Sequence, residues 1–527
     1  MRALLLPFTS RFVTFTLVVV ATVLLGVLAL AVPGWRAVLL LPLLVLAGLS
    51  LLGVRDLLQT RHSILRNYPI AGHLRFLFEE IRPEMRQYFF EGEKDGMPFS
   101  RDKRAIAYQR AKSELDKRPF GTQFDVYSDA YEWVNHSIAP VPVAHEPFRI
   151  AIGGPDCRHP YASSVLNISA MSFGSLSGAA VESLNRGAAI AGCLHNTGEG
   201  GVSRHHRHGG ELIYQIGTGY FGCRDERGDF SIERLLATIG KAPVRAIEIK
   251  LSQGAKPGLG GVLPAAKVTR EIADAREVPV GVTVHSPSTH KEFSDVAGLV
   301  DFVERIAEAT GVPVGIKSAV GQVVFWDQLA DHMATTGRGP DFVTVDGGEG
   351  GTGAAPLVFT DHVAFPFRDG MSTVFRAFAA HGLHQHIAFF GSGKLGFPQE
   401  AVAAMSLGAD GVNVAREAML SIGCIQAQRC HTGHCPTGVA TQSRWLARGL
   451  VPTDKAARAG NYVMALRHEL LRVSRACGVN HPALIDRDAI RLVSEDGALV
   501  SVAERYGIPT TIDRLSSEDR SVLEGGR

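Results

Sequence analysis

A regular alternation of short apolar segments and amphipathic segments runs through the middle of this 527-residue chain. The apolar segments are rich in β-branched residues, which is typical of buried strands. They predict strands at 165–170, 192–196, 246–250, 280–284, 314–317, 342–345, 387–390 and 411–414, with helices between them at stretches such as 265–276, 296–309 and 398–407. Alternating strands and helices imply a parallel sheet, and eight repeats imply an α/β fold, a closed (β/α)8 TIM barrel. A doubly wound open sheet is the alternative.

The residues that follow the predicted strands indicate where the chemistry lies. Active sites of such barrels are built at the carboxyl ends of the strands. Clusters of glycine, lysine, serine or glutamine follow seven predicted strands in succession, beginning at positions 171, 197, 250, 286, 317, 346 and 391. We therefore expect one small-molecule site at this end of the barrel, with Ser172 of the first cluster among its cofactor-binding residues.

Two glycine-rich clusters after the sixth and seventh predicted strands are typical of phosphate-binding loops. Glycine lets backbone N–H groups approach an anion closely, and a following helix N-terminus favours negative charge. Phosphate sites of (β/α)8 barrels commonly follow the last strands. The predicted phosphate-binding residues are Gly350, Gly351, Thr352, Gly353, Gly391, Ser392 and Gly393.

Cationic and amide side chains at other strand ends suit a flavin and an acidic substrate. Lys317 ends the fifth predicted strand, where a fixed cation would stabilise a reduced flavin ring. Lys250 and Lys256 could hold the carboxylates of a dicarboxylic substrate, and Gln253 between them could donate to a flavin carbonyl. Glu199 could manage protons or an amino group. The histidines at 205, 206 and 208 have no matching carboxylate spacing, so we expect a solvated loop there rather than a metal site.

Three of the seven cysteines fall within twelve positions, as Cys424-x5-Cys430-x4-Cys435 followed by proline. Three thiolates with His431 or His434 could form a structural zinc site. They could also hold an iron–sulfur cluster. The run follows the eighth predicted strand, at the expected active-site end, where an electron-transfer centre has a role beside a flavin and a closed zinc site has none. The position of the run therefore favours an iron–sulfur cluster.

The first 66 residues are a predicted transmembrane helical hairpin. No charged residue lies between Arg11 and Arg36, and the apolar runs 13–32 and 37–54 are each about long enough to cross a bilayer. A signal peptide is less consistent with two successive spans. Arg2 and Arg11 precede the first span, and arginines follow the second at 55, 61 and 66. This excess of arginine on the two outer sides of the hairpin predicts a two-span anchor in the cytoplasmic (inner) membrane, with the rest of the chain in the cytoplasm.

The remaining segments carry less information. We expect a lead-in at 67–150 that is partly helical (75–88 and 102–117), a barrel with the cysteine run at 151–442, and a helical extension at 443–527 with helices at 455–477 and 487–506. A net charge of +2, without a basic stripe, gives no case for nucleic acid as a partner. Isolated cysteines outside the run suit a reducing compartment.

Five motifs, in this order along the chain, resemble the FMN-binding synthase domain of glutamate synthase. The resemblance covers roughly residues 150–445, and the whole chain looks like the stand-alone, membrane-anchored members of the FMN-binding glutamate synthase family. The motifs are Ser169-Ala-Met-Ser-Phe-Gly174, Asn196-Thr-Gly-Glu-Gly-Gly201, Ile249-Lys-Leu-Ser-Gln-Gly-Ala-Lys-Pro-Gly258, Gly350-Gly-Thr-Gly-Ala-Ala-Pro356 and Cys435-Pro-Thr-Gly-Val-Ala-Thr-Gln442.

The resemblance implies a (β/α)8 barrel that holds FMN beside a [3Fe-4S] cluster ligated by Cys424, Cys430 and Cys435. It implies that the loops with Lys250, Gln253, Lys256 and Lys317 face FMN and 2-oxoglutarate. The implied reaction is reductive amination: ammonia condenses with 2-oxoglutarate, and hydride from the flavin reduces 2-iminoglutarate to L-glutamate. Electrons would reach FMN through the cluster.

Departures from the family pattern limit these expectations. The chain has no recognisable glutaminase domain or dinucleotide-binding motif, so we expect a separate glutaminase to supply ammonia and an electron donor protein, ferredoxin-like or a reductase subunit, to supply electrons. The larger enzymes have glutamine at Val262, His-Asp at Gly348-Glu349 and a Pro-Pro-His-His run where Ser288 begins this chain's version. These changes leave open a related 2-oxo acid or amine, as in an N-methylglutamate synthase-like reaction, or an electron-relay subunit of a membrane complex.

Overall fold

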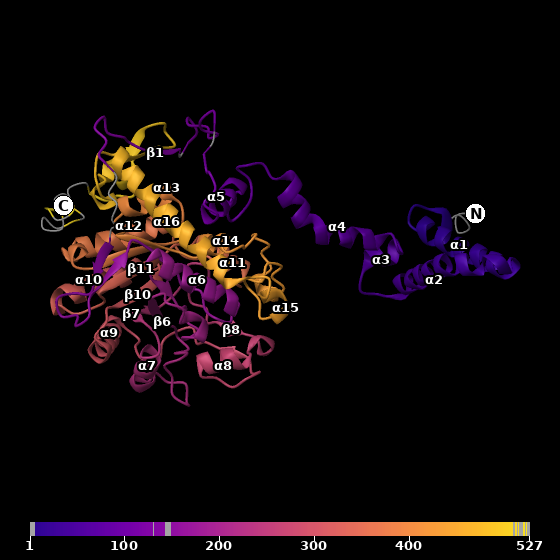
Figure 1. The fold of residues 1–527 in the computed structure, drawn as a ribbon, viewed down its shortest axis with the longest axis horizontal. Helices are drawn as coiled ribbons and strands as arrows, with labels where there is room; N and C mark the ends of the chain where they lie inside the picture. The colour runs from indigo at the N-terminus through magenta and orange to yellow at the C-terminus, as the bar shows by residue number, and fades with distance from the viewer. Residues whose placement is uncertain are drawn as a thin grey trace. The chain divides into compact units, whose positions relative to one another are not determined.

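The chain's structure, a computed structural model, describes residues 6–117, 119–129, 131–142, 149–509, 512, 513, 515, 520, 521 and 523. It divides into two compact units, Met1–Asp102 and Lys103–Arg527, which are described separately (Figure 1).

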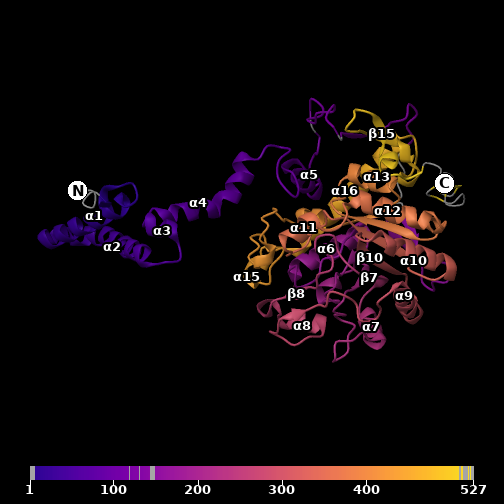
Figure 2. The same ribbon diagram turned by 180° about the vertical axis from the view of Figure 1, so that it is seen from behind.

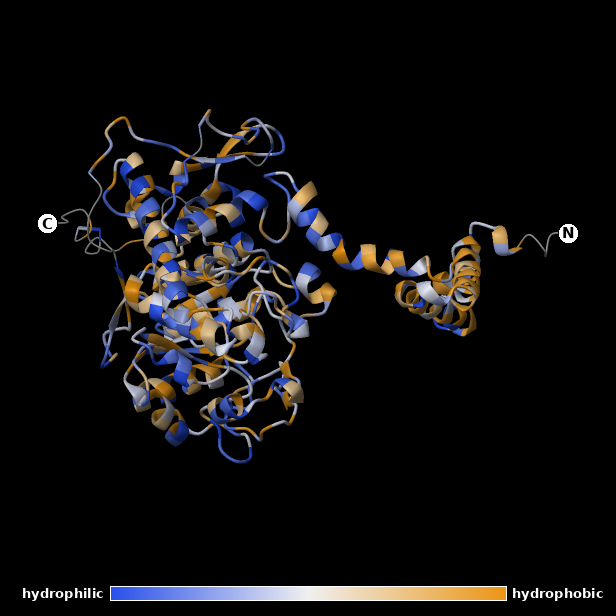
Figure 3. Ribbon diagram, turned by 45° about the vertical axis from the view of Figure 1, so that its right-hand side comes forward, coloured by the Kyte–Doolittle hydropathy of each residue, from blue (hydrophilic) through white to orange (hydrophobic). Residues whose placement is uncertain are grey.

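The N-terminal unit begins with two long apolar helices. α1 (Val13–Ala31) and α2 (Arg36–Leu58) pack together and are joined by the short η2 (Pro33–Trp35). The spans Val13–Ala31 and Pro33–Leu58 are long and apolar enough to cross a membrane, with mean hydropathies of 2.7 and 2.6. Their hydrophobic colour in Figure 3 runs around the helices. The unit also contains η1 (Leu6–Phe8), α3 (Ser63–Asn67), α4 (Gly72–Met85) and the π-helical η3 (Arg86–Phe90). Arg2, which entered the orientation argument, lies outside the described residues.

Eight parallel strands form a closed barrel in the second unit, which confirms the predicted fold class. Neighbouring strands pair in chain order, and the eighth strand pairs with the first to close the ring. The strands are β4 (Leu166–Ile168), β5 (His195–Asn196), β6 (Leu212–Ile216), β7 (Val244–Lys250), β10 (Val314–Ala319), β11 (Phe342–Asp346), β12 (Ala388–Ser392) and β13 (Gly411–Val414).

Helices surround the barrel strands (Figure 1). Several begin with a side-chain cap: Ser177 accepts from the Ala180 N–H at the start of α6, and Asp295 accepts from the Gly298 N–H at the start of α9. The outer helices are α6 (Gly178–Ala191), α7 (Ile232–Ile239), α9 (Val296–Thr310), α10 (Val323–Thr336), α11 (Leu357–His362), α12 (Phe367–Ala379), α13 (Pro398–Ser406) and α14 (Arg416–Ser421), with η4 (Arg204–His206) and η6 (Leu383–Gln385) in loops.

One predicted barrel strand is wrong and one was missed, so that the count of eight is nevertheless right. Segment 280–284 is β-branched, but Val280 and Val282 are exposed and Gly281 turns the chain with φ +69°. The third barrel strand is instead β6, which is buried throughout. The polar Gln215 interrupts its apolar pattern, and the amide of this residue donates a buried hydrogen bond to Glu248.

The segment between β7 and α9 is an insertion rather than a strand–helix repeat. It contains β8 (Val262–Leu263), η5 (Ala265–Lys267), α8 (Arg270–Arg276) and β9 (Val284–His285), and β8 pairs with β9 antiparallel. The predicted helix 265–276 is therefore shorter and split. This insertion supplies part of the site described below.

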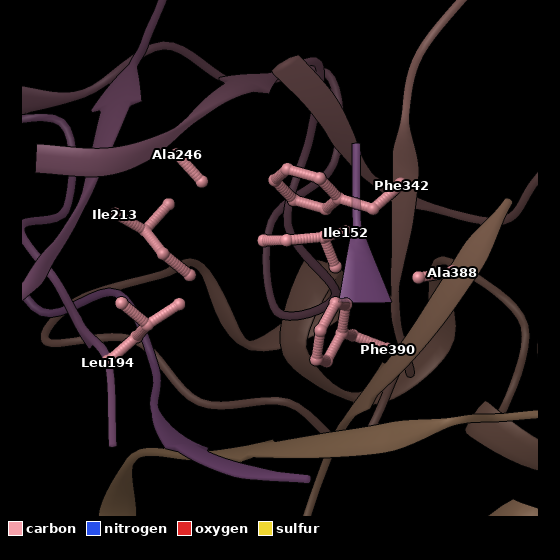
Figure 4. Close-up of a cluster of buried hydrophobic side chains, with 7 residues drawn as sticks. All are labelled: Ile152, Leu194, Ile213, Ala246, Phe342, Ala388 and Phe390. Carbon is pink, nitrogen blue, oxygen red and sulfur yellow. The ribbon is translucent and has the colours of Figure 1, made fainter. Parts of the chain in front are cut away.

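The amino-terminal end of the barrel is closed by a small apolar cluster. Two antiparallel strands, β2 (Arg149–Ile152) and β3 (Tyr161–Ser164), precede the barrel. Ile152 of β2 lies between the rings of Phe342 and Phe390 and the side chains from the opposite strands (Figure 4). Buried apolar contact of this kind plugs the end of the barrel opposite to the strand ends that carry the polar loops.

The carboxyl-terminal segment combines one long helix with a small antiparallel sheet and short helical turns. α16 (Pro452–Ala476) packs against α6, α13 and α14 (Figures 1 and 2). The predicted helix at 487–506 is wrong: this stretch contains β14 (Ile490–Val493) and β15 (Leu499–Ser501), and β14 pairs with β1 (Glu132–Val134). The other elements are α5 (Arg101–Ala111), α15 (Arg444–Ala447), η7 (Cys430–Thr432), η8 (Pro482–Leu484), η9 (Arg487–Ala489) and α17 (Val502–Arg505).

Candidate active site

An ion pair lies at the carboxyl end of the barrel. Lys250, the last residue of β7, places Nζ 2.7 Å from Oε2 of Glu199 in the loop after β5, and the two side chains are only 12% and 21% exposed. Burial raises the pKa of Glu199, but the cations Lys250, Arg276 and Lys256 outweigh burial and hold that pKa below its ordinary value. Glu199 is therefore a carboxylate at neutral pH.

Two more cations surround this carboxylate, and one of them was not predicted. Burial lowers the pKa of Lys256, while Glu199 opposes that effect. Arg276, at the end of α8, is buried, donates to the Phe173 carbonyl at 3.3 Å and lies 5.0 Å from the centre of the Phe221 ring. Burial lowers the pKa of Arg276 and Glu199 again opposes it. No sequence pattern singled out Arg276, because it lies in the last turn of an ordinary helix in the insertion.

These residues form what we call the charged wall: Glu199, Lys250, Lys256 and Arg276. A pocket beside it is lined by Glu199, Thr218, Lys250, Leu251, Ser252, Gln253, Lys256, Gly258, Leu259, Gly261, Pro287 and Ser288. Ser288, one of the departures from the family pattern, is thus in the pocket lining. Val262, another departure, is 61% exposed in β8 next to it.

A buried carboxylate inside the barrel supports the loop that carries Glu199. Glu248 of β7 accepts hydrogen bonds from Asn196 (2.8 Å), Gln215 (2.6 Å) and Thr344 (2.8 Å), which lie on three other strands. Asn196 in turn accepts from the Gly198 N–H at 3.0 Å. Three donors compensate the desolvation of this carboxylate, and the network fixes the backbone next to Glu199.

The charged wall meets the glycine-rich loop after β11 at Gln253. Gln253 Nε2 lies 3.5 Å from the Thr352 hydroxyl, and the Gly254 N–H donates to Asp346 Oδ2 at 2.8 Å. Lys317 is buried, and its Nζ lies 3.9 Å from the same carboxylate oxygen. A side chain at Gly254 would meet the Gly347 carbonyl oxygen at 1.7 Å, so the close approach of these two loops requires glycine.

The predicted phosphate-binding residues lie beside two cations, Lys394 of the same glycine-rich cluster and Arg416, which no sequence pattern singled out. Gly351 packs on Arg416 after β13: a Cβ at Gly351 would lie 2.7 Å from its Cδ and Nε, whereas a Cβ at Gly353 would meet open space. Arg416 donates to the Glu349 carbonyl. Burial lowers the pKa of Lys394, which follows β12, and Arg416 adds to that effect. We call 350–353, 393, 394 and 416 the glycine wall.

Not every predicted phosphate-binding residue offers a free loop amide. Gly391 and Ser392 are the last residues of β12, and the Ser392 carbonyl accepts from the Gly347 N–H at 2.9 Å. The Gly350 N–H closes a turn on the Gly347 carbonyl at 2.8 Å. Gly393 lies beyond the strand, with φ +133°.

The cysteine run is attached to the loop after β4. The Gln442 amide donates to the carbonyls of Gly174 and Leu176 at 3.0 and 2.9 Å. Ser172 in that loop hydrogen-bonds the Ser175 hydroxyl at 3.0 Å. A Cβ at Gly198 would lie 2.6 Å from the Ser172 nitrogen, so the Ser172 and Glu199 loops are also in contact.

The three thiols of the run interact electrostatically with one another. Burial raises the pKa of Cys424 to about 11, with further contributions from Cys430 and Cys435. Burial also raises the pKa of Cys435, but hydrogen bonds from the Ala440, Thr437 and Val439 backbone and from the Thr437 side chain outweigh it and lower the pKa. Within the described residues, no group of three His, Cys, Asp or Glu side chains is arranged to hold a metal ion.

The histidine-rich loop is packed rather than solvated, which corrects that expectation. His206 is fully buried, and the Ser203 N–H donates to its Nδ1 at 3.0 Å. His205 Nε2 lies 3.3 Å from Glu271, and His208 Nε2 lies 3.6 Å from Glu182. These carboxylates belong to the neighbouring helices α8 and α6, so they are distant from the histidines in the sequence and the motif itself did not show them.

Comparison with known proteins assigns the family. Residues 156–480 match the model of the conserved region in glutamate synthase. The chain is 36% identical over 490 residues to the glutamate synthase large subunit-like protein YerD of Bacillus subtilis, covering 85% of this chain and 93% of that protein. It is 35% identical over 317 residues to the archaeal glutamate synthase [NADPH] of Methanocaldococcus jannaschii, covering 59% of each.

Solved structures show a more distant likeness. A mandelate oxidase variant with an FMN adduct matches with a TM-score of 0.42 and 14% identity, covering 77% of this chain and 98% of that one. No conclusion about chemistry follows at this level. The family match spans most of the barrel unit, including the charged wall, the glycine wall and the cysteine run. The chain belongs to the glutamate synthase family of oxidoreductases.

Proposed function

We propose that this protein is an FMN- and iron–sulfur-dependent oxidoreductase that converts 2-oxoglutarate and ammonia into L-glutamate. The observation that carries the proposal is the charged wall, in which three cations surround one carboxylate beside a pocket at the carboxyl end of the barrel. The net positive charge of this wall suits a substrate with two carboxylates.

Each residue of the charged wall has a role in the proposed reaction. Lys256 lines the pocket and binds a substrate carboxylate, whereas Arg276, outside the pocket lining, adds positive charge beside Glu199. Lys250 keeps Glu199 ionised. Glu199 holds ammonium and takes one of its protons, so that ammonia can attack the 2-oxo carbon; it returns that proton as the hydroxyl of the resulting carbinolamine leaves as water, which gives 2-iminoglutarate.

The residues of the glycine wall fit the phosphate of FMN. Gly350, Gly351, Thr352, Gly353, Gly391, Ser392 and Gly393 are the proposed phosphate-binding residues, and Lys394 and Arg416 would add positive charge. Gln253 and Ser172 would hydrogen-bond the ring, and buried Lys317 would favour its anionic reduced form. When bound, FMN supplies the hydride that reduces the substrate carbon.

The cysteine run is the proposed site of a [3Fe-4S] cluster. Cys424, Cys430 and Cys435 would be its ligands, because three thiolates within twelve positions suit iron–sulfur ligation. The run's contact with the Ser172 loop suits electron delivery to the barrel.

The proposal extends to partners and location. The hairpin, residues 1–66, anchors the chain in the cytoplasmic membrane with the lead-in (67–150), barrel (151–442) and extension (443–527) in the cytoplasm. An electron donor protein and a separate glutaminase supply electrons and ammonia.

Steady-state turnover tests the function. The anaerobically purified chain is first checked for flavin absorbance and for the EPR signal of a three-iron cluster, and then receives 2-oxoglutarate, ammonium and a chemical reductant. We expect glutamate, and at least a tenfold higher KM for 2-oxoglutarate in Lys256→Ala, since that variant loses a carboxylate contact. Absence of glutamate from protein with both cofactors rejects the proposal.

Two departures from the family pattern favour a second candidate. Ser288 replaces a family residue and lines the pocket, and the Glu349 carboxylate accepts from the Phe367 N–H at 2.8 Å where the family has aspartate. A different 2-oxo acid or an alkylamine is then the substrate, with the same cofactors. Parallel assays with 2-oxoglutarate, shorter 2-oxo acids and methylamine distinguish the two candidates by the highest kcat/KM.

A further inference from the structure

A continuous apolar face runs along α4 and η3 of the N-terminal unit. Its residues recur at helical spacing of three and four positions, and every one of them is exposed. They are Leu74, Leu77, Phe78, Ile81, Met85, Tyr88 and Phe89. Figure 3 shows hydrophobic and hydrophilic colours along this segment, in contrast to the mainly hydrophobic α1 and α2. An exposed apolar face of this length indicates a binding surface.

The start of this segment is fixed to the end of α2. Asp56, in the last turn of α2, is buried, and it accepts from the Ile70 N–H at 3.0 Å and contacts His73 Nε2 at 2.9 Å. α4 begins at Gly72. The apolar face therefore starts directly beside the end of the second apolar helix.

We propose that this face lies in the interfacial layer of the bilayer, parallel to the membrane surface. The proposal rests on the membrane anchor given under the proposed function, because the anchor places the start of α4 where the span ends. Phe78, Tyr88 and Phe89 are the residue types that favour the interface. A bilayer is always within reach of this face, whereas a soluble partner is not.

The charges of the segment identify the lipid chemistry. The rest of the helix surface carries three arginines and three glutamates between residues 75 and 86 together with the exposed Phe76, and Arg75 pairs with Glu79 at 2.9 Å. Balanced charge gives no attraction to anionic headgroups. The face therefore binds through its apolar side chains and takes zwitterionic lipid as readily as anionic lipid.

Quenching by brominated lipids tests the proposal on the full chain in phosphatidylcholine proteoliposomes. An environment-sensitive fluorescent amino acid replaces Leu77 on the apolar face, Glu80 on the opposite face or Val23 in α1. We expect bromine near the headgroup end of the acyl chains to quench the probe at 77 at least about threefold more than the probe at 80. Raising the salt from about 0.1 to 0.5 M changes the quenching at 77 by less than about one fifth.

The probe at 23, in the middle of the proposed span, is read with lipid brominated near the ends of its acyl chains, and it separates failure of this inference from failure of the anchor. Quenching at 23 without quenching at 77 overturns the inference and leaves the anchor intact. A blue-shifted but unquenched probe at 77 means that protein covers the face, either a second copy or another partner, and also overturns it. No quenching at 23 refutes the anchor and the inference with it.

Discussion

The two walls of the candidate site are built by different means. The charged wall uses side chains, and two of its four members, Lys256 and Arg276, lie on the insertion between β7 and α9. The glycine wall uses backbone in short turns after β11 and β12, with two cations behind it. A phosphate is the same in every FMN, so fixed backbone suffices, whereas side chains on an insertion can change with the substrate and leave the barrel intact.

The largest predicted contrast between the walls is in stability. Lys250→Met leaves Glu199 largely buried without its closest partner, so we expect the free energy of unfolding to fall by about 3 kcal/mol in urea denaturation. Lys394→Met removes a cation that Arg416 repels, and we expect a change of less than about 1 kcal/mol.

Adding Glu199→Gln to Lys250→Met is the control, because it removes the stranded charge. It should recover at least about half of the lost stability. If Lys250→Met and Lys394→Met lowered the free energy of unfolding equally, the predicted difference in stability between the two walls would be wrong.

The next contrast concerns FMN binding. Gly351→Ala places a methyl group 2.7 Å from Arg416, so we expect FMN to bind roughly thirty-fold more weakly in equilibrium dialysis, about 2 kcal/mol. Gly353→Ala faces open space and is the matched control, with a change of less than about threefold. In FMN-saturated enzyme, neither change should alter the KM for 2-oxoglutarate. If only Gly353→Ala weakened FMN binding, the proposed contact of the phosphate with the backbone at Gly351 would be wrong.

A smaller effect is expected beneath the charged wall. Thr344→Val removes one of the three donors to buried Glu248, so we expect the free energy of unfolding to fall by about 1.5 kcal/mol. Thr360→Val serves as the control, since its exposed hydroxyl donates only within its own helix. The prediction is contradicted if both variants unfold at the same urea concentration as the unmodified chain.

The smallest effect is a pH dependence restricted to the charged wall. The pKa of Glu199 in the fold lies below its ordinary value of 4.5, so its stabilising contribution is complete above pH 4.5 and is lost as the pH falls through the folded pKa. The stability difference between the unmodified chain and Glu199→Gln should therefore be constant from pH 7 to about 5 and shrink below about 4.5. The corresponding difference for Lys394→Met should stay constant over this range, because that lysine remains protonated in acid. A Glu199 difference that grows in acid contradicts the assigned ion pair.

Sequence periodicity predicted the barrel because buried strands and amphipathic helices alternate strongly. It failed where tertiary contacts override local pattern: β6 contains Gln215, whose amide is needed by Glu248, and 280–284 resembles a strand but turns at Gly281. Within the site, lysines in glycine-rich motifs were predictable. Arg276 and Arg416 were not, because each is an ordinary helix-terminal residue until the fold places it against Glu199 or Gly351.

The central claim is that one site binds flavin at the glycine wall and 2-oxoglutarate at the charged wall, in reacting contact. A single-turnover experiment tests this most directly: the cofactor-loaded chain is reduced anaerobically, excess reductant is removed, and 2-oxoglutarate is added with ¹⁵N-ammonium. The account predicts that flavin absorbance returns as ¹⁵N-glutamate forms in proportion to the flavin reoxidised, and that Lys256→Ala slows both at low 2-oxoglutarate. Flavin that stays reduced while both cofactors remain bound would contradict it.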